Sequence, residues 1–180
     1  FKPEVMRAVR DAGVDIINDI WALRQPGALA VVAQHPQCGV CLMHMHRDPQ
    51  TMQVAPMAGD VVLQVHDFLR GQVQLLQGHG VDASRIVLDP GIGFGKTVQQ
   101  NSTLLAHQGQ IQSIGYPILA GWSRKSSLGA VTGLPVEDRL APSVAAALLS
   151  VDRGARIVRV LDVRATVAAL AVWSAMQATN

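Results

Sequence analysis

Short apolar runs alternate with longer amphipathic stretches along the whole chain. The apolar runs are continuous and rich in Val, Ile and Leu, which is typical of strands buried on both faces of a parallel sheet. The five strands that they predict are Ile16–Ile20, Gly39–Met45, Arg85–Asp89, Ile118–Trp122 and Ile157–Val160.

The stretches between these runs are predicted to be helices. Pro3 and Glu4 suit a first helical turn, and Gly13 suits the end of the same helix. The other predicted helices run from Pro26 to about His35, from Asp60 to Gly78, from Asn101 to His107, from Glu137 to about Arg153, and from about Arg164 to Met176.

Strands and helices in alternation predict right-handed βαβ crossovers and a parallel sheet. The predicted strands start about every 25–45 residues, which matches the repeat of a (β/α)8 TIM barrel of about 250 residues. Five strands could also form an open doubly wound sheet. The expected fold class is therefore α/β, in a single domain over residues 1–180. The polar residues at the strand ends are the evidence that can distinguish a barrel from an open sheet.

Composition narrows the class of function. Hydrophobic residues make up 49% of the chain and the formal net charge is +2, so we expect a well-buried domain rather than a disordered one. The charges are scattered without a basic run, so no nucleic-acid partner is expected. No apolar run reaches the roughly 18 residues of a membrane span, so no membrane partner is expected either.

Four residues around one predicted strand could bind a metal. Cys38 and Cys41 have the CxxC spacing of a redox or metal pair, but no second pair accompanies them. We interpret them as buried strand residues of a protein in a reducing cytoplasm. His44 and His46 would share one face of an extended strand and could hold a metal, but hydrogen bonds to backbone groups are the expectation.

Polar side chains follow every predicted strand, at the end where barrels and open α/β sheets bind their ligands. They comprise Asn18 and Asp19, His44, the run Asp89–Lys96, the run Ser123–Ser126, and the segment Arg159–Asp162. Because all five strands carry such groups at the same end, the sequence predicts a single site.

Asp89 precedes a loop with glycines at positions 91, 93 and 95. Its carboxylate could accept two N–H donors from one planar heterocycle, or it could cap a turn. The glycines would let the backbone approach a ligand closely. The loop is not a P-loop, because Pro90 occupies the place of the first glycine, and it does not fit the dinucleotide-binding pattern.

Cations follow the last two predicted strands. Arg124 and Lys125 lie between two serines, where they could hold a phosphate or a carboxylate or form a solvated basic loop. Arg159 lies within an otherwise apolar strand, and a buried arginine needs an anionic partner. We expect it to face a ligand, with an ion pair to Asp162 as the alternative.

Four segments resemble dihydropteroate synthases in their order and spacing. They are Ile17–Ile20, Cys41–Met45, Leu88–Lys96 and Gly121–Ser126, and the last two are the most specific. The resemblance implies an eight-stranded barrel, usually a homodimer. It also implies condensation of 6-hydroxymethyl-7,8-dihydropterin pyrophosphate with p-aminobenzoate, with release of pyrophosphate and the help of Mg²⁺.

The same resemblance implies roles for individual residues. The pterin would be bound at its edges and lined on its faces, p-aminobenzoate would lie beside it, and an arginine would hold the pyrophosphate. The residues implied are Asn18, Met43, Asp89, Phe94, Gly121 and Lys125 for the pterin, Lys125 and Ser126 for p-aminobenzoate, and Arg159 for pyrophosphate. No metal ligand is expected in this chain, and sulfonamides would compete with p-aminobenzoate.

Two departures from the family pattern bear on activity. Leu161 stands where the family usually has a histidine, and leucine cannot hydrogen-bond a phosphate. The family's first three strands, with a Mg²⁺-binding Asn and a pterin-binding Asp, have no counterpart, so we expect a partial barrel that is not catalytically competent alone. One alternative is the pterin-binding domain of a corrinoid-dependent methyltransferase, which would not need Ser123–Ser126. The other is a non-catalytic paralogue.

Overall fold

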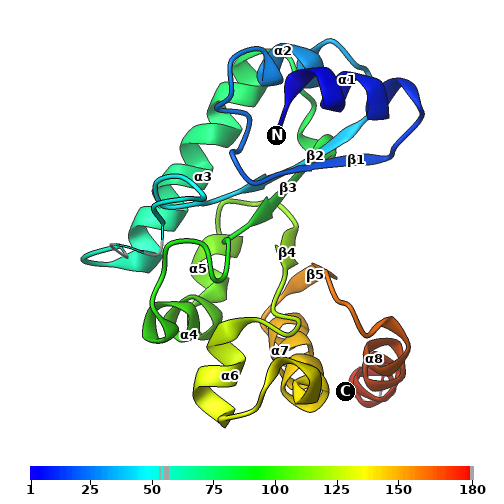
Figure 1. Ribbon diagram of the computed structural model, residues 1–180. Coiled ribbons are helices and arrows are strands. Elements are labelled where there is room, and N and C mark those ends of the chain that lie inside the picture. Colours follow the sequence, from blue (N-terminus) through cyan, green and yellow to red (C-terminus); the bar gives the residue numbers. More distant parts are fainter. Residues whose placement is uncertain (53, 55–56, 179–180) are drawn as a thin grey trace.

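A five-stranded parallel sheet forms the centre of the molecule (Figure 1). The computed structural model describes residues 1–52, 54 and 57–178. The strands are β1 (Ile16–Asp19), β2 (Gly39–Met43), β3 (Ile86–Asp89), β4 (Ile118–Ala120) and β5 (Ala155–Val158). Their spatial order is β1-β2-β3-β4-β5, the same as their order in the chain. A doubly wound sheet reverses its order at a switch point, whereas a barrel adds each strand on the same side. The prediction of a partial TIM-type barrel is therefore confirmed.

Helices follow the strands and pack on one side of the sheet. They are α1 (Pro3–Asp11), α2 (Ala28–Ala33), α3 (Val61–Gly78), α4 (Val98–Ala106), α5 (Gln108–Gln112), α6 (Ser126–Thr132), α7 (Leu140–Asp152) and α8 (Val163–Gln177). Two short 3-10 helices, η1 (Ala83–Arg85) and η2 (Val136–Asp138), complete the set. No helix among the described residues is long and apolar enough to cross a membrane.

The strand register divides the sheet into two faces. Ile17, Val40 and Ile86 lie side by side in one row, and they belong to the large core cluster that includes helix residues. The next row turns to the other face because side chains alternate along a strand. There Cys41, Val87 and Leu119 form a separate, small apolar cluster.

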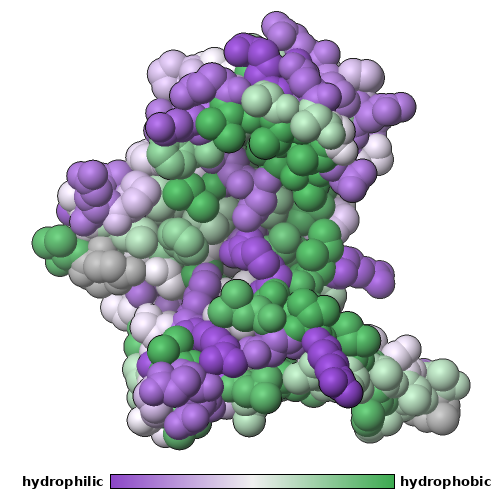
Figure 2. Space-filling model, turned by 45° about the vertical axis from the view of Figure 1, so that its right-hand side comes forward, coloured by the Kyte–Doolittle hydropathy of each residue, from purple (hydrophilic) through white to green (hydrophobic). Residues whose placement is uncertain are grey.

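This second face, called here the inner face, corresponds to the inside of a barrel. Ile16 and Ile157 also lie on it by register and are 41% and 38% exposed. Figure 2 turns this side of the molecule forward and shows a hollow with hydrophilic side chains along its middle. The sheet thus places an open, partly polar surface opposite its helix-covered face.

Several element boundaries differ from the prediction. The strands β1, β2 and β4 end earlier than expected, so Ile20, His44 and Trp122 lie in the loops that follow. The strand β5 runs over Ala155–Val158 instead of Ile157–Val160, so Arg159 follows the strand instead of lying within it. The pairing of β4 with β5 also has a register irregularity between Ile118 and Leu119.

The start of α4 was predicted wrongly. Thr97, not Asn101, caps this helix, since its side chain accepts a hydrogen bond from the Gln100 amide and the Gln100 side chain accepts one from the Thr97 amide. Asn101 is instead buried inside the helix. The short helices α5 and α6 were not predicted. Pro142 is the third residue of α7, where a proline is tolerated.

Candidate active site at the carboxyl ends of the strands

The strand ends bring most of the predicted binding residues to one place on the inner face. Met43 lies beside Asp89 in the sheet, and Gly121 and Arg159 directly follow the paired residues Ala120 and Val158. Asn18 lies on the same face, exposed and in register with Cys41. Ser126 is exposed at the first position of α6. Whether these residues have the roles expected of them stays a prediction.

Asp89 is the centre of this arrangement. It is 1% exposed. One carboxylate oxygen accepts a hydrogen bond from the Gly91 amide at 2.7 Å, and the other forms an ion pair with Arg159, whose Nη1 lies 3.2 Å away. The first contact is the turn-capping role weighed in the sequence analysis, and the second connects the ends of β3 and β5.

The loop after Asp89 needs glycine for two reasons. Gly91, Gly93 and Gly95 all have positive φ angles, of 70°, 81° and 71°. At Gly91 a Cβ atom would also collide with the His44 carbonyl. The loop therefore passes against the end of β2 more closely than any other residue would allow.

Lys96 holds this loop from inside. It is 4% exposed, and its Nζ donates to the carbonyls of Gly91 at 2.8 Å, Phe94 at 3.1 Å and His44 at 3.4 Å. The pKa of Lys96 is lowered to about 7, mainly by burial; Asp89 raises it and the positive charge of Lys125 lowers it, both to a smaller extent. The sequence analysis gave Lys96 no role. In a P-loop the lysine binds phosphate, whereas the Lys96 amine donates its hydrogen bonds to backbone carbonyls of its own loop and of His44.

Lys125 is the second cation near Asp89. Its Nζ lies 4.9 Å from the centre of the Phe94 ring and donates to the Ile92 carbonyl. Burial is the main cause that lowers the pKa of Lys125 to about 8, with a smaller raising effect of Asp89 and a lowering effect of Arg159. Asp89 is thus surrounded by three cations, Lys96, Lys125 and Arg159.

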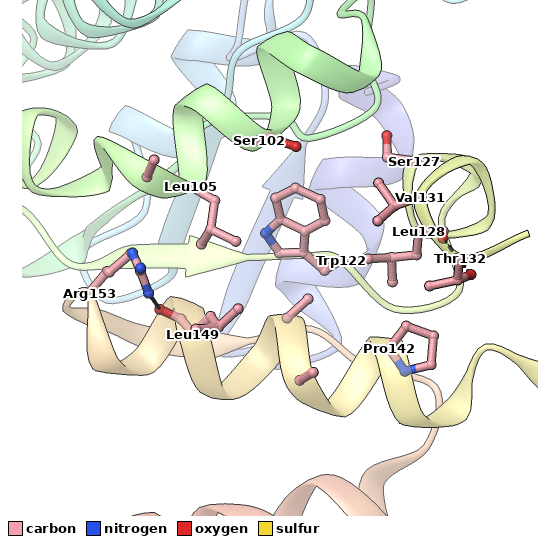
Figure 3. A pocket seen from close by; sticks show the side chains of 13 residues that line it. Ser102, Leu105, Trp122, Ser127, Leu128, Val131, Thr132, Pro142, Leu149 and Arg153 are labelled. Carbon is pink, nitrogen blue, oxygen red and sulfur yellow. Dashed lines mark hydrogen bonds between the residues drawn. The ribbon is translucent and has the colours of Figure 1, made fainter.

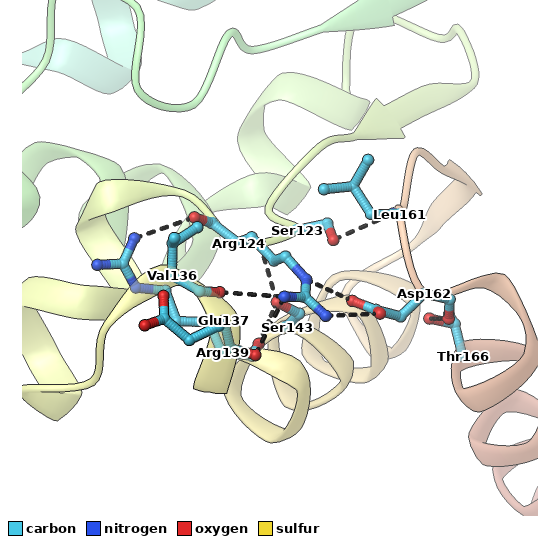
Figure 4. Close-up of polar contacts among 9 residues, drawn as sticks. All are labelled: Ser123, Arg124, Val136, Glu137, Arg139, Ser143, Leu161, Asp162 and Thr166. Atoms are coloured by element: carbon cyan, nitrogen blue, oxygen red, sulfur yellow. Dashed lines mark hydrogen bonds and ion pairs between the residues drawn. The ribbon is translucent and has the colours of Figure 1, made fainter.

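Arg124 does not face this site (Figure 4). Its guanidinium binds Asp162 through two hydrogen bonds, of 2.9 and 2.8 Å, and also donates to the carbonyls of Val136 and Glu137. The suggestion that Arg124 could hold a phosphate or carboxylate is therefore not supported, and the alternative pairing of Arg159 with Asp162 is wrong.

Asn101 is a second residue that the sequence analysis did not connect with the site. Its side chain is 1% exposed, accepts a hydrogen bond from the Gly93 amide at 2.9 Å and donates one to the Ser127 hydroxyl at 2.9 Å. It therefore fixes the glycine loop against the start of α6, which follows Lys125. Its position inside a helix gave no signal of this contact.

The candidate metal ligands do not gather around a metal. Among the described residues there is no group of three His, Cys, Asp or Glu side chains that could hold one. The thiols of Cys38 and Cys41 form no disulfide and belong to the cores on opposite faces of the sheet. His44 packs edge-on against Phe68, with ring centres 5.0 Å apart, and its Nδ1 is buried without a hydrogen-bond partner. Backbone hydrogen bonds of His44 and His46 stay a prediction. Burial, with the charge of Lys96, lowers the pKa of His44 to about 2.

An apolar pocket lies behind this site, between α4, α6 and α7 (Figure 3). Its walls include Leu105, Leu128 and Leu149, and the Trp122 ring lies in its middle. Trp122 directly follows Gly121, but it belongs to the core cluster on the helix-covered face. The pocket is therefore separate from the group of residues around Asp89.

Comparison with known proteins gives a consistent result. Residues 1–161 match the family described as pterin binding enzyme. The chain is 45% identical over 174 residues to the dihydropteroate synthase of Neisseria meningitidis serogroup B, and 46% identical over 176 residues to that of Haemophilus influenzae. These matches cover 94% and 97% of this chain, but only 61% and 63% of those proteins. The chain thus spans less than two thirds of the length of these relatives.

Solved structures are similar over nearly the whole chain. The dihydropteroate synthase of Burkholderia cenocepacia in complex with 7,8-dihydropteroate has a TM-score of 0.93 and 55% identity, covering 99% of this chain and 66% of that one. The enzyme of Xanthomonas albilineans with 4-aminobenzoic acid has a TM-score of 0.92 and 51% identity, covering 99% of this chain and 63% of that one. The dihydropteroate synthase of Stenotrophomonas maltophilia, 49% identical with a TM-score of 0.97, is covered to 68%.

Proposed function

Because the chain belongs to the dihydropteroate synthase family of pterin-binding enzymes, we propose that the full-length protein makes 7,8-dihydropteroate. It would condense 6-hydroxymethyl-7,8-dihydropterin pyrophosphate with p-aminobenzoate and release pyrophosphate. The observation that carries this proposal is the buried Asp89 carboxylate with Arg159, Lys125 and Lys96 around it. One carboxylate among three cations suits a ring that donates N–H groups and carries an anion beside it.

The reaction needs few proton transfers from the protein. The bond between the pterin methylene carbon and the pyrophosphate oxygen breaks, and its electron pair leaves with the pyrophosphate. The amine nitrogen of p-aminobenzoate forms the new bond to that carbon and then loses a proton. Positive charge develops on the pterin methylene group, and the Asp89 carboxylate would stabilise it, while Arg159 would stabilise the departing anion.

The remaining residues would bind and orient the substrates. Asn18 would hold a second edge of the pterin, and Met43, Phe94 and Gly121 would line the ring. Lys125 would lie between the two substrates, with Ser126 beside p-aminobenzoate, where sulfonamides would compete. The described residues contain no group of three His, Cys, Asp or Glu side chains that could hold Mg²⁺. A Mg²⁺ requirement of the full-length protein stays a prediction.

Two further properties belong to the proposal. A homodimer in the cytoplasm is the form in which we expect the full-length protein to act. The two reduced, buried cysteines among the described residues are compatible with a reducing compartment. Analytical ultracentrifugation of the purified protein would give its state of association.

Asp89→Asn tests the proposed function directly. We expect the full-length protein to form dihydropteroate from the two substrates, and the isosteric variant to lose about 100-fold or more in kcat/KM, which corresponds to about 3 kcal/mol. Asp162→Asn is a matched control, because that carboxylate pairs with Arg124, away from Asp89. Product would be measured by liquid chromatography. A wild-type protein that binds neither pterin nor p-aminobenzoate would overturn the proposal.

A non-catalytic paralogue is the second candidate, and Leu161 favours it. This side chain is 72% exposed beside Asp162 and cannot donate a hydrogen bond to a phosphate. A protein of this kind would bind the pterin substrate but form no dihydropteroate. Leu161→His should then raise turnover from a negligible level, whereas an efficient wild-type enzyme would identify the synthase.

A further inference from the structure

Both carboxylate oxygens of Asp89 are already occupied by groups of the chain itself. The Gly91 amide donates to Oδ1 at 2.7 Å, and Arg159 binds Oδ2 through its Nη1 at 3.2 Å. The Arg159 guanidinium also lies against Gly121. A Cβ atom built on that glycine would lie 2.7 Å from Nη2 and 3.2 Å from Cζ of Arg159. Arg159 thus takes up the two features of the inner face that the proposed function assigns to the pterin ring.

The pterin ring and the Arg159 guanidinium would compete for the same two places, Asp89 and the surface of Gly121. A pterin that donates N–H groups to Asp89 would have to share Oδ2 with Arg159. A ring that packs on Gly121 needs the space that the guanidinium fills, and a guanidinium that leaves this space breaks its ion pair with Asp89. Asp89 is 1% exposed and held by the sheet, whereas the Arg159 side chain is 40% exposed. Arg159 is therefore the partner that can move when the ring binds.

The free-energy cost of moving Arg159 depends on whether its guanidinium can pair with another anion after it leaves Asp89. The carboxylate would keep the favourable charges of Lys96 and Lys125, which both interact with Asp89. The arginine would lose its ion pair, and it regains one only if the ligand brings an anion of its own. A diphosphate group does this, and a hydroxymethyl group does not.

We propose that Arg159 is a specificity-determining residue that makes binding of the pterin ring depend on the diphosphate. It competes with the ring for Asp89 and for the surface of Gly121, and the diphosphate draws it away from both. Pterins without a phosphate group have to break the Arg159–Asp89 pair without a replacement. This inference rests on the proposed function and adds to it a discrimination between two pterins that differ only in the diphosphate.

Replacement of Arg159 should change the two affinities in opposite directions. In the full-length protein, we expect Arg159→Met to bind 6-hydroxymethylpterin roughly 3–10-fold more tightly, because the competitor is gone, and the diphosphate ester about 10-fold or more weakly. Isothermal titration calorimetry with each ligand measures both constants. Arg159→Gln, which keeps a polar side chain, should likewise bind 6-hydroxymethylpterin more tightly and the diphosphate ester more weakly.

Inorganic pyrophosphate gives a second measurement, which begins with the wild-type protein: no effect of pyrophosphate on pterin binding there would already contradict the proposal. If pyrophosphate draws Arg159 away from Asp89, it should tighten binding of 6-hydroxymethylpterin to the wild-type protein, and coupling between the two ligands is reciprocal. In Arg159→Met this coupling should disappear. A pyrophosphate effect of the same size in both proteins would contradict the proposal.

Arg124→Met is the matched control, because it removes another arginine–carboxylate pair that does not involve Asp89. We expect its two affinities to stay within about twofold of the wild type. If Arg159→Met weakens both pterins, or weakens the diphosphate ester and leaves the other unchanged, the competition is refuted while the proposed function stands. If the wild-type protein binds neither pterin, both proposals fall.

Discussion

Lys96 is a buried cation whose nearest hydrogen-bond partners are carbonyl groups. Three carbonyls from two loops accept its hydrogen bonds, and no carboxylate oxygen lies within ion-pair distance of it among the described residues. Its charge is therefore stabilised only by dipoles and by the more distant Asp89, and the pKa falls to about 7. A residue that fixes the site loop in this way makes the loop sensitive to pH.

This pKa predicts how stability varies with pH. Between pH 7 and 10.5 the unfolded chain holds a proton on Lys96 that the native protein has lost, so the free energy of unfolding should rise with pH across that window. Below pH 7 Lys96 is charged in both the native and the unfolded state. The free-energy cost of burying its charge is then fully present and no longer varies with pH. One group contributes at most about 1.4 kcal/mol per pH unit.

Urea unfolding of the full-length protein at pH 7 and pH 9, with Lys96→Met as the reference, measures this effect. The free energy of unfolding of the wild type minus that of the variant should increase with pH, because the other titrating groups, including Lys125, are present in both proteins. A difference that is constant, or that decreases toward pH 9, would contradict the assignment.

Single residues could be predicted only where their neighbours in sequence give the direction of the side chain. Asp89 could be assigned to the site because it ends a buried strand, and the glycines after it marked a close approach of the backbone. The partner of Arg159 could not be predicted, because Asp89 lies 70 residues away in sequence and at the end of a different strand. The contacts of Lys96 and Asn101 depend on loops whose path is set by tertiary packing.

At the scale of elements, Asn101 connects three parts of the site. It lies in α4, accepts from the loop after β3 and donates to Ser127 in α6. The two segments that it joins carry Phe94 and Lys125, which are in contact with each other. Loss of the Asn101 amide should therefore disturb the arrangement of the binding residues as well as the stability.

Gln108 offers a matched comparison for this prediction. It is also a buried amide, 3% exposed, and it joins α5 to the end of α7 by donating to the carbonyls of Ser150 and Arg153. We expect Asn101→Leu and Gln108→Leu each to lower the free energy of unfolding by about 1–3 kcal/mol. Only Asn101→Leu should also weaken pterin binding, by roughly tenfold.

Calorimetric titration with the pterin, alongside urea unfolding, separates the two effects. Ser127→Ala should have a smaller effect on binding than Asn101→Leu, since the Gly93 hydrogen bond remains. An equal loss of affinity in the Gln108 variant would mean that Asn101 acts through stability alone.

The elements themselves were largely predictable, and their ends were not. Apolar runs identified all five strands. The central strands β2, β3 and β4 are buried on both faces, whereas β1 and β5 are partly exposed on the inner face. Strand ends were overestimated where apolar residues such as Trp122 continue into a loop that packs on the core. The helices α5 and α6 were missed because they are short and begin next to residues that also suit loops.

At the scale of the whole molecule, the order of the strands is the property that decides the fold. Each strand is added beside the previous one, so the carboxyl ends of successive strands follow one another along one edge of the parallel sheet. Sequence periodicity predicted the parallel sheet, but it could not distinguish a barrel from a doubly wound sheet, because both have the same alternation of strands and helices. Only the spatial order separates them.

The inner face predicts how the 180-residue polypeptide behaves when it is produced alone. Ile16 and Ile157 are exposed on that face, and among the described residues β1 and β5 each have a single neighbouring strand. We expect this polypeptide to form no measurable dihydropteroate, and unpaired edges of this kind favour self-association. The assay compares it with the full-length protein under the same conditions. Detectable dihydropteroate from the 180-residue polypeptide would refute the expectation.

The two thiols on either side of the sheet have a practical consequence. Cys38 is packed in the helix-covered core and Cys41 in the inner cluster, and burial raises the pKa of the Cys41 thiol. Neither can react with an alkylating reagent until the side chains that cover it move away. The order in which the two thiols are labelled would therefore give the order in which the two faces of the sheet become exposed.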